Sequence, residues 1–280
     1  MANQREEILS EIYKVQALPA SAVTAIHKLR DENANLNAIA NSLKTDPGLT
    51  ANILRLANSA AFCSARKLSS LNEAAMRLGA ALLGQLILTA SLPSAVRGEI
   101  KGYDMPAGRL LAASLTSAFG VEELARVLRI PQPPQAYTAG LLADIGKIVL
   151  GTYVNVDATP ILSFAQRNNV SFDIAEREVL GTDHAEVGAA LLERWKLPPE
   201  LVEIVRWHHA PESSPNPSTT LDLVHLSTHL SLLGGQFGAG DGLRYRVSDA
   251  VVDRWPLKNK DVEQAICRTN SRVEQIQSAM

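Results

Sequence analysis

Apolar residues recur at steps of three and four through most of the chain, which is the spacing of one face of an α-helix. In the first hundred residues this pattern predicts five short helices, and Asn35, Asp46 and Ser70 stand where N-caps are expected. Gly79 is expected to end the helix that follows Ser70, before a strongly apolar helix over about 80–91. No segment alternates apolar and polar residues over the length of a strand. We therefore expect an all-α protein.

A loop rich in proline and glycine over 93–108 separates this series from a second one. Helices of the second series are predicted over about 109–128, 135–144, 145–153, 160–168, 172–180, 184–195, 199–209 and 220–233. A polar last helix is expected from about Asp261, and it could fray or dock on a partner. The order predicts an N-terminal helical lobe over 1–98, a second helical lobe over 105–233 and a C-terminal helical extension over 234–280.

The composition narrows the function classes. Hydrophobic residues make up 46% of the 280 residues and charged residues 20%, so a large core is available. A net charge of −2 argues against a general nucleic-acid or membrane-surface binder, which would need a basic excess. Aromatic residues are scarce at 5%, which disfavours base-stacking platforms.

Targeting signals and cysteine spacing point to the cytoplasm. The N-terminus is charged from its fifth residue and has no apolar signal segment. The most apolar stretch, 82–96, is interrupted by proline and polar residues and is short for a membrane span. Cys63 and Cys267 lie far apart and form no metal or redox motif. We expect a cytoplasmic protein without membrane contact.

Histidine placement is the most informative chemical feature. Five of the six histidines follow residue 183: His184, His208, His209, His225 and His229. The last two are spaced i,i+4 and should share a helix face, whereas His208 and His209 are adjacent and would diverge by about 100° on a helix. Imidazoles with carboxylates are ligands for zinc, iron or manganese. A metal site is one interpretation, and ordinary capping, surface and pocket histidines are the favoured one.

A second informative segment is A-G-L-L-A-D-I-G-K at 139–147. It places the carboxylate of Asp144 and the ammonium of Lys147 at a break between two helices. The pattern allows Asp144 to be the N-cap of the helix that carries Ile148, or a catalytic group, and the N-cap is favoured. A Gly-rich phosphate loop and a serine nucleophile motif are both absent from the sequence.

Several motifs occur together in a recognisable order. They are D-P-G-L-T at 46–50, L-R-L-A-N-S-A at 54–60, S-S-L-N-E-A at 69–74, R-L-G at 77–79, the 139–147 segment, E-R-E-V-L-G-T-D-H-A-E-V-G at 176–188 and W-H-H at 207–209. Over about 18–233 the chain resembles the HDOD family, HD-related output domains of bacterial signalling proteins. The resemblance implies a two-lobed all-α fold whose second lobe is similar to a degenerate HD phosphohydrolase domain.

Several positions that bind metal in the related HD enzymes hold other residues in this chain, and these differences determine which activity the resemblance implies. HD phosphohydrolases bind metal through an early histidine, a His-Asp doublet, later histidines and a final aspartate. Here the early, doublet and final positions hold Ala113, Ala143 and Thr228. Ligand-type side chains remain at Asp144, His184, His208 and His209, and with Lys147 we call these five residues the remnant pocket. His225 and His229 lie off the matching positions. The resemblance therefore implies neither an enzyme nor a bound metal or other cofactor.

The function expected from the sequence is a non-catalytic signalling output or regulatory module that acts by protein–protein interaction. The alternative is a metal-dependent HD-type phosphohydrolase or phosphodiesterase. A nucleotide-like ligand in the remnant pocket is less favoured than a protein partner, and nucleic acid is not an expected partner.

A basic segment of the first lobe is the predicted contact surface. Between residues 47 and 98 there are five positive residues and one negative residue. Arg66 and Lys67 lie in a short loop before Ser70, and Arg55 could reach the same face. Loops held between helices commonly carry recognition residues. We expect these three residues to contact an acidic partner, and the alternative is that they are ordinary solvating charges.

Overall fold

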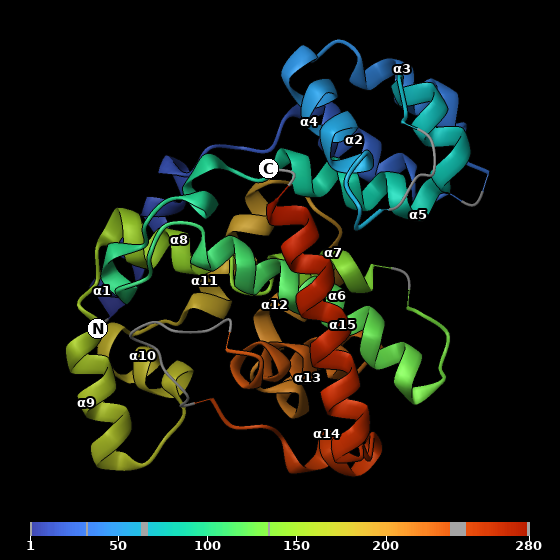
Figure 1. Cartoon of the computed structure of the whole chain (residues 1–280). Coiled ribbons are helices and arrows are strands. Elements are labelled where there is room, and N and C mark those ends of the chain that lie inside the picture. Colours follow the sequence, from blue (N-terminus) through green and yellow to red (C-terminus); the bar gives the residue numbers. More distant parts are fainter. Residues whose placement is uncertain (1, 32, 63–66, 134, 236–244, 279–280) are drawn as a thin grey trace.

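The computed structural model describes residues 2–31, 33–62, 67–133, 135–235 and 245–278. In these ranges the chain is built from helices, and the one β-type pairing is an isolated antiparallel bridge between Ile100 and Met105 (Figure 1). The prediction of an all-α protein is confirmed.

The N-terminal half contains α1 (Ala2–Ser10), η1 (Glu11–Lys14), α2 (Ala20–Lys28), α3 (Leu36–Leu43), α4 (Pro47–Ala57), α5 (Leu71–Ser91), η2 (Ser94–Arg97), η3 (Lys101–Tyr103) and α6 (Arg109–Leu128). The remainder contains α7 (Ala136–Leu142), α8 (Gly146–Ile148), η4 (Val149–Val154), α9 (Ala158–Asn168), α10 (Phe172–Leu180), α11 (His184–Arg194), α12 (Pro199–Trp207), η5 (Pro211–Ser213), α13 (Thr219–Leu233), α14 (Asp249–Arg254) and α15 (Asn259–Gln277).

Helices α2–α5 form the first lobe, and the predicted caps begin three of them. The side chains of Asn35 and Asp46 accept the backbone N–H groups three residues on, at 3.0 and 2.9 Å. Ser70 Oγ accepts the N–H of Glu73 at 3.2 Å in the same way. Each cap satisfies one of the N–H groups that a helix start leaves unpaired. These local bonds explain why the helix starts could be predicted from the sequence.

Helix α5 joins the two lobes and bends at Gly79, whose φ of 77° is favourable only for glycine. The predicted helix end is therefore a kink between two helical halves. By length and composition α5 is the one helix in the described ranges that could cross a membrane. Just over half of its apolar window, 56%, is buried against the rest of the chain. The second half of α5 thus belongs to the protein core.

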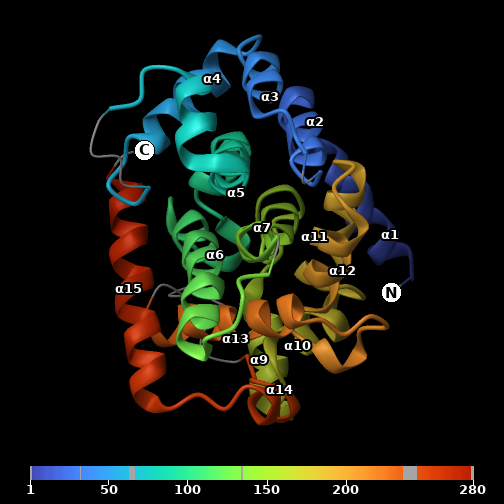
Figure 2. The same ribbon diagram turned by 90° about the vertical axis from the view of Figure 1, so that its right-hand side faces the viewer.

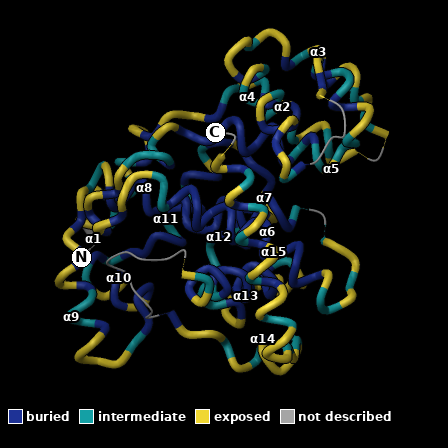
Figure 3. The backbone as a smooth tube through the Cα atoms, viewed as in Figure 1, coloured by how far each residue is buried: buried dark blue, intermediate teal, exposed yellow. Residues whose placement is uncertain are grey.

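Helix α6 is the centre of the second lobe. Sixteen of its residues are buried, an uninterrupted run from Leu110 to Ala125. It packs against α7, α13 and α15, and Figure 3 shows this region as the most continuously buried part of the backbone. Where one helix was expected over 145–153, the chain forms the short α8 and then η4, a π-helical segment over Val149–Val154. The helices around α6 position the remnant pocket.

Both ends of the chain pack on the second lobe. Residues of α1 and η1, which the expected 1–98 boundary groups with the first lobe, lie against α11, where Arg194 Nη1 donates to the carbonyls of Ile12 and Val15 at 2.6 and 2.8 Å. The polar C-terminal helix, α15, runs along α6 of its own chain (Figure 2). The short α14 was not predicted.

Candidate functional site

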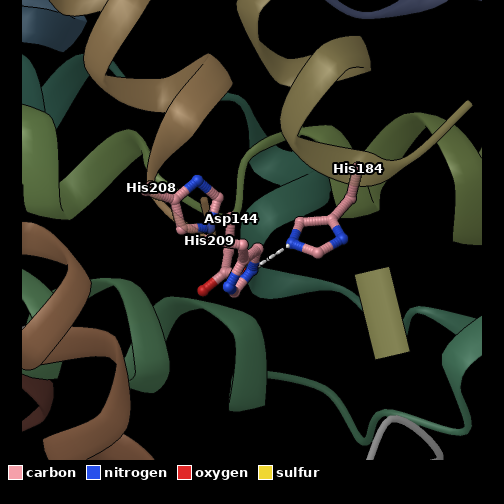
Figure 4. A group of neighbouring side chains, drawn as sticks. All are labelled: Asp144, His184, His208 and His209. Carbon is pink, nitrogen blue, oxygen red and sulfur yellow. Dashed lines mark hydrogen bonds and ion pairs between the residues drawn. The ribbon is translucent and has the colours of Figure 1, made fainter. Parts of the chain in front are cut away.

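The remnant pocket is assembled from three places in the second lobe. Asp144 and Lys147 lie at the junction of α7 and α8. His184 is the first residue of α11, and His208 and His209 directly follow α12; Figure 4 shows these three histidines with Asp144. One potential ligand atom from Asp144 and each of the three histidines lies within 4.8 Å of all the others. The structure thus brings together all five residues that the sequence assigned to this pocket.

Asp144 does not cap a helix, so that interpretation was wrong. Its side chain is buried and Oδ1 lies 2.8 Å from the equally buried Lys147 Nζ. Burial alone would raise the pKa of Asp144, but the positive charges of Lys147 and of a protonated His184 lower it to about 2. The first position of α8 is instead preceded by Ile145. Asp144 is therefore one half of a buried ion pair.

His184 is held by a carboxylate on the neighbouring helix. Its Nδ1 lies 2.5 Å from Glu176 Oε2, and the same oxygen accepts the His184 backbone N–H at 3.1 Å. Tyr103 donates its hydroxyl to the other oxygen of Glu176. Burial would lower the pKa of His184, but the charge of Glu176 raises it above the usual value. The arrangement favours an imidazolium at position 184.

His208 and His209 do not diverge as predicted. Their ring centroids are 3.9 Å apart because α12 ends at Trp207, so both side chains project from the turn after the helix. His208 Nδ1 donates to the Val205 carbonyl at 2.7 Å. His209 Nε2 lies 2.9 Å from His184 Nε2 (Figure 4). Burial lowers the pKa of His208 to about 4 and that of His209 well below its usual value.

His225 and His229 share one face of α13, as predicted from their spacing, with ring centroids 4.7 Å apart. His225 Nδ1 donates to the His208 carbonyl at 2.7 Å, and its Nε2 accepts the backbone N–H of Ser248 at 2.9 Å. Both ring nitrogens are thus used to hold the backbone around the remnant pocket. Between them on α13, Thr228 donates to the His225 carbonyl at 2.8 Å and offers no carboxylate.

Two residues that contact the remnant pocket were missed by the sequence analysis. Glu176 is the first residue of the 176–188 motif, eight residues before His184, and nothing in that motif indicated its role. Tyr245 follows a glycine-rich stretch and carried no signal. Its ring stacks on His209 with centroids 4.4 Å apart and an interplanar angle of 8°, and Lys147 Nζ lies 5.2 Å from its centroid. Tyr245 thus covers the pocket from the C-terminal extension.

Most nitrogen and oxygen atoms of the remnant pocket that could bind a metal are already paired with other protein groups. Asp144 faces an ammonium, and one of the bonded nitrogens of His184 and His209 must carry a proton. A protonated His184 offers no lone pair to a metal. Among the histidine nitrogens of the remnant pocket, only His208 Nε2 is buried without a hydrogen-bond partner in the described part of the chain. In this arrangement three of the four side chains that could hold a metal ion are paired with Lys147, with Glu176 or with one another.

The buried histidines predict a loss of stability in acid. Burial lowers the pKa of His225 to about 3, below its unfolded value of about 6.5, so the unfolded chain binds this proton first. The contribution of His225 to stability is therefore lost as the pH falls from about 6.5 towards 3. We expect His225→Gln to reduce the slope of unfolding free energy against pH near pH 5 by about 1.4 kcal/mol per pH unit. Urea titrations at several pH values measure it, and an unchanged slope would contradict the assignment.

The predicted basic surface is partly described. Arg55 on α4 and Lys67 are exposed, whereas Arg66 lies outside the described residues. Asn58 joins the two ends of the loop, donating to the Leu68 carbonyl at 3.0 Å and accepting the Leu68 N–H at 2.7 Å. The pKa of the half-buried Arg97 is lowered by burial and by the nearby charge of Arg55. Two guanidinium groups therefore lie on this side of the first lobe.

An all-α fold of two lobes, with aspartate and histidines gathered in the second, defines an HD-type helical domain. The HDOD domain family model matches residues 15–211, and the chain belongs to the HDOD family. The resemblance inferred from the sequence motifs is confirmed.

Solved structures share this fold over nearly the whole chain. An HDOD domain protein of unknown function from Geobacter sulfurreducens is 25% identical, covers 98% of this chain and 94% of its own, and has a TM-score of 0.68. A protein from Shewanella amazonensis SB2B, named as a candidate phosphohydrolase, is 23% identical with 98% of both chains covered and a TM-score of 0.70. A candidate signal transduction protein from Marinobacter aquaeolei VT8 is 20% identical, with 99% and 65% covered and a TM-score of 0.68.

A curated relative from Treponema pallidum (strain Nichols), named only as an uncharacterized protein, is 24% identical over 214 residues. The match covers 72% of this chain and 39% of the relative. The chain thus spans about two fifths of the length of that protein.

Proposed function

We propose that this HDOD protein is a non-catalytic output or regulatory module that acts in the bacterial cytoplasm by binding a protein partner. The observation that carries the proposal is the self-contained bonding of the remnant pocket. Asp144 is neutralised by Lys147, and His184 is bonded to both Glu176 and His209. A hydrolase needs ligands with free lone pairs and an open position for an activated water.

The second candidate is a metal-dependent HD-type phosphohydrolase. It is favoured by the gathering of one carboxylate and three imidazoles within 4.8 Å. For a metal to bind there, His184 would have to lose a proton and Lys147 would have to leave Asp144. The buried Ala113, Ala143 and Thr228 supply no replacement ligand.

A hydrolysis assay separates the two candidates. We expect the full chain to release no product from cyclic di-GMP, with or without added Mn²⁺, above the level given by Asp144→Asn. The reason is that the pocket activates no water. Turnover that depends on Mn²⁺ and is lost in both Asp144→Asn and His208→Ala would contradict the proposal.

The basic surface of the first lobe is the proposed contact with an acidic partner. Arg55 lies on α4 three residues before Asn58, Lys67 directly precedes Leu68, and the charge of Arg55 is near Arg97. Holding the loop ends by side-chain hydrogen bonds limits the entropy that a partner must remove on binding. The net positive charge of this region supplies the attraction to acidic residues.

Charge reversal tests this surface. The double variant Arg55→Glu, Lys67→Glu should weaken capture of the partner from native-host lysate about tenfold at low salt, with a smaller loss at high salt. Unfolding free energy should change by no more than about 0.5 kcal/mol because both side chains are exposed. The control, Arg167→Glu on α9, makes a charge reversal at an exposed site of the other lobe. Equal capture by the double variant and the control would place the contact elsewhere.

A further inference from the structure

A groove lies on the surface of the second lobe and is lined by residues of α11, α12 and the loop that follows α12. Helices α11 and α12 pack side by side (Figure 2), and the groove has a volume of about 600 Å³. Leu197 and Val202 give it an apolar floor, since they are only 5% and 7% exposed. Its other apolar lining residues are the exposed Pro199 and Pro215 and the half-buried Trp207. A recess of this size and composition can hold a short stretch of peptide.

The loop side of this groove is held in place by Glu203 of α12. Glu203 Oε1 accepts the hydroxyl of Ser214 at 2.8 Å and the backbone N–H of Asn216 at 3.1 Å. The side-chain amide of Asn216 donates to both oxygens of the same carboxylate, at 3.0 and 2.7 Å. Pro215 lies between these two loop residues, so its ring is held beside the groove before a partner arrives. A groove that is formed in advance reduces the entropy cost of binding.

The charged side chains that line the groove leave one negative charge without a cation. They are Glu193, Glu203 and Arg206. Arg206 Nη2 donates to Glu193 Oε1 at 3.1 Å, whereas Glu203 accepts only from neutral donors in the described ranges. Glu203 Oε2 accepts one of these bonds, and a carboxylate oxygen has lone pairs for two. The groove can therefore attract and bond a cationic side chain at Glu203.

Trp207, the first residue of the W-H-H motif at 207–209, has no role in the remnant pocket but lines this groove. It is spaced i,i+4 from Glu203, so the two side chains share one face of α12. Its indole N–H makes no hydrogen bond in the described part of the chain, and its ring is half-buried. An indole ring offers an apolar face together with one donor. Trp207 can therefore contact an apolar residue and donate to a peptide carbonyl.

The length of the groove matches a short extended peptide. From Pro199 to Trp207 the groove follows α12 for about 12 Å, at a rise of 1.5 Å per residue. A polyproline II helix rises about 3.1 Å per residue, so about four of its residues span this distance. Its backbone has no internal hydrogen bonds, which leaves its carbonyls free to accept from Trp207. Grooves with aromatic walls bind proline-rich segments in this conformation.

We propose that this groove binds a short proline-rich segment of a protein partner that carries one arginine. The prolines pack on Leu197 and Val202, Trp207 donates to a peptide carbonyl, and the guanidinium pairs with Glu203. Arginine suits this place because its planar guanidinium bonds a carboxylate and also stacks on an aromatic ring. The groove shares no residue with the basic surface of the first lobe. It is a second contact surface, and either surface can fail its test without the other.

Three synthetic peptides test the partner chemistry on the full chain. The probe is acetyl-PPLPPR-amide. Acetyl-PPLPPE-amide keeps the prolines and reverses the charge, and acetyl-GGSGGR-amide keeps the arginine without apolar side chains. In isothermal titration calorimetry we expect the probe to bind at one site per chain, about tenfold more tightly than either matched peptide. The NMR signal of the Trp207 indole N–H, identified by its loss in Trp207→Phe, should shift when the probe binds.

Two variants and a control locate the bound probe. Glu203→Gln removes the charge but keeps an oxygen that accepts from the loop, and it should weaken binding of the probe about fivefold. Trp207→Phe keeps an apolar ring and removes the donor, and it should weaken binding about fivefold to tenfold, the value of one hydrogen bond. Glu178→Gln removes an exposed carboxylate from α10 of the same lobe and should bind the probe as the wild type does.

Several results would overturn the proposal. They are no binding of the probe at about 1 mM, equal binding of the three peptides, and equal affinity of Glu203→Gln and Glu178→Gln for the probe. A dimer by light scattering that Trp207→Phe dissociates would also overturn it, because the groove would then be an interface between two copies. Circular dichroism melting curves of the variants establish that a loss of binding is not a loss of fold. The comparison of the three peptides on the wild type does not depend on any variant.

Discussion

Replacing Gly146 with alanine is expected to destabilise the fold by about 3 kcal/mol or more. A Cβ atom at this position would lie 2.0 Å from the carbonyl oxygen of His184 and 2.6 Å from the backbone nitrogen of Gly188. Both are backbone atoms of α11, so the contact can be relieved only by moving α8 away from that helix. Urea unfolding followed by circular dichroism measures the loss.

Gly48→Ala is the matched control. Position 48 is exposed in the first turn of α4, and a Cβ there would approach only the side chain of Asp46, at 3.5 Å. The substitution should be neutral or stabilise by a few tenths of a kcal/mol, since alanine restricts the unfolded chain. A loss below about 1 kcal/mol in Gly146→Ala would show that α8 and α11 are not this close. Gly146 of the 139–147 motif therefore has a packing reason that needs no catalysis.

Truncation of Arg272 to alanine should lower the free energy of unfolding by about 2–3 kcal/mol. This is somewhat less than the effect of removing one partner from a fully buried ion pair. From α15, Arg272 Nη1 reaches Glu122 Oε2 at 2.6 Å and Glu123 Oε1 at 3.4 Å. The two carboxylates are 7% and 1% exposed. The guanidinium also covers the Phe119 ring at 4.0 Å from its centroid. Removal leaves both charges buried with fewer partners and uncovers the ring.

Arg268→Ala on the same helix provides the comparison. Its Nη1 is 3.8 Å from Glu123 Oε2 and its side chain is 44% exposed, so the pair is screened by solvent and should contribute less than about 1 kcal/mol. Chemical denaturation of the two variants should therefore give clearly different losses. Similar small losses would mean that α15 is not held on α6 by this network.

The hydrogen bonds and ion pairs of Glu122 connect the first lobe, the second lobe and the C-terminal extension. Gln85 of α5 donates to Glu122 Oε1 at 2.6 Å, and Gln132 donates to the same oxygen at 2.7 Å. Glu122 therefore bonds to the first lobe through α5 and to the C-terminal extension through Arg272. We therefore expect Arg272→Ala to weaken both the contact of Glu122 with α5 and the contact of α15 with α6.

Features that depend on neighbouring residues in the sequence could be predicted. Helices α6 and α10 begin and end where the periodicity placed them, and α10 stops before Gly181, which has a φ of 77°. The caps at Asn35, Asp46 and Ser70 are local hydrogen bonds and were also predicted. Helix α14 was missed because six residues are too few for the periodicity to register.

Features that depend on distant segments could not be predicted from this pattern. The stacking of Tyr245 on His209 joins residues from the extension and the turn after α12. The sequence placed His208 and His209 in a helix over 199–209, but α12 ends at Trp207, two residues earlier, and both rings turn inward. The motif that contains Glu176 was recognised, whereas its bond to His184 follows from the packing of α10 on α11.

The central claim, that the remnant pocket is not a catalytic metal centre, is tested most directly by the metal content of the full chain. The measurement is elemental analysis after dialysis against Mn²⁺ or Zn²⁺ and removal of free ions. The account predicts metal far below one ion per chain, with no difference between the wild type and His208→Ala, because Lys147 and the bonded histidines occupy the donor atoms. One or two tightly bound ions per chain, lost in His208→Ala, would contradict it.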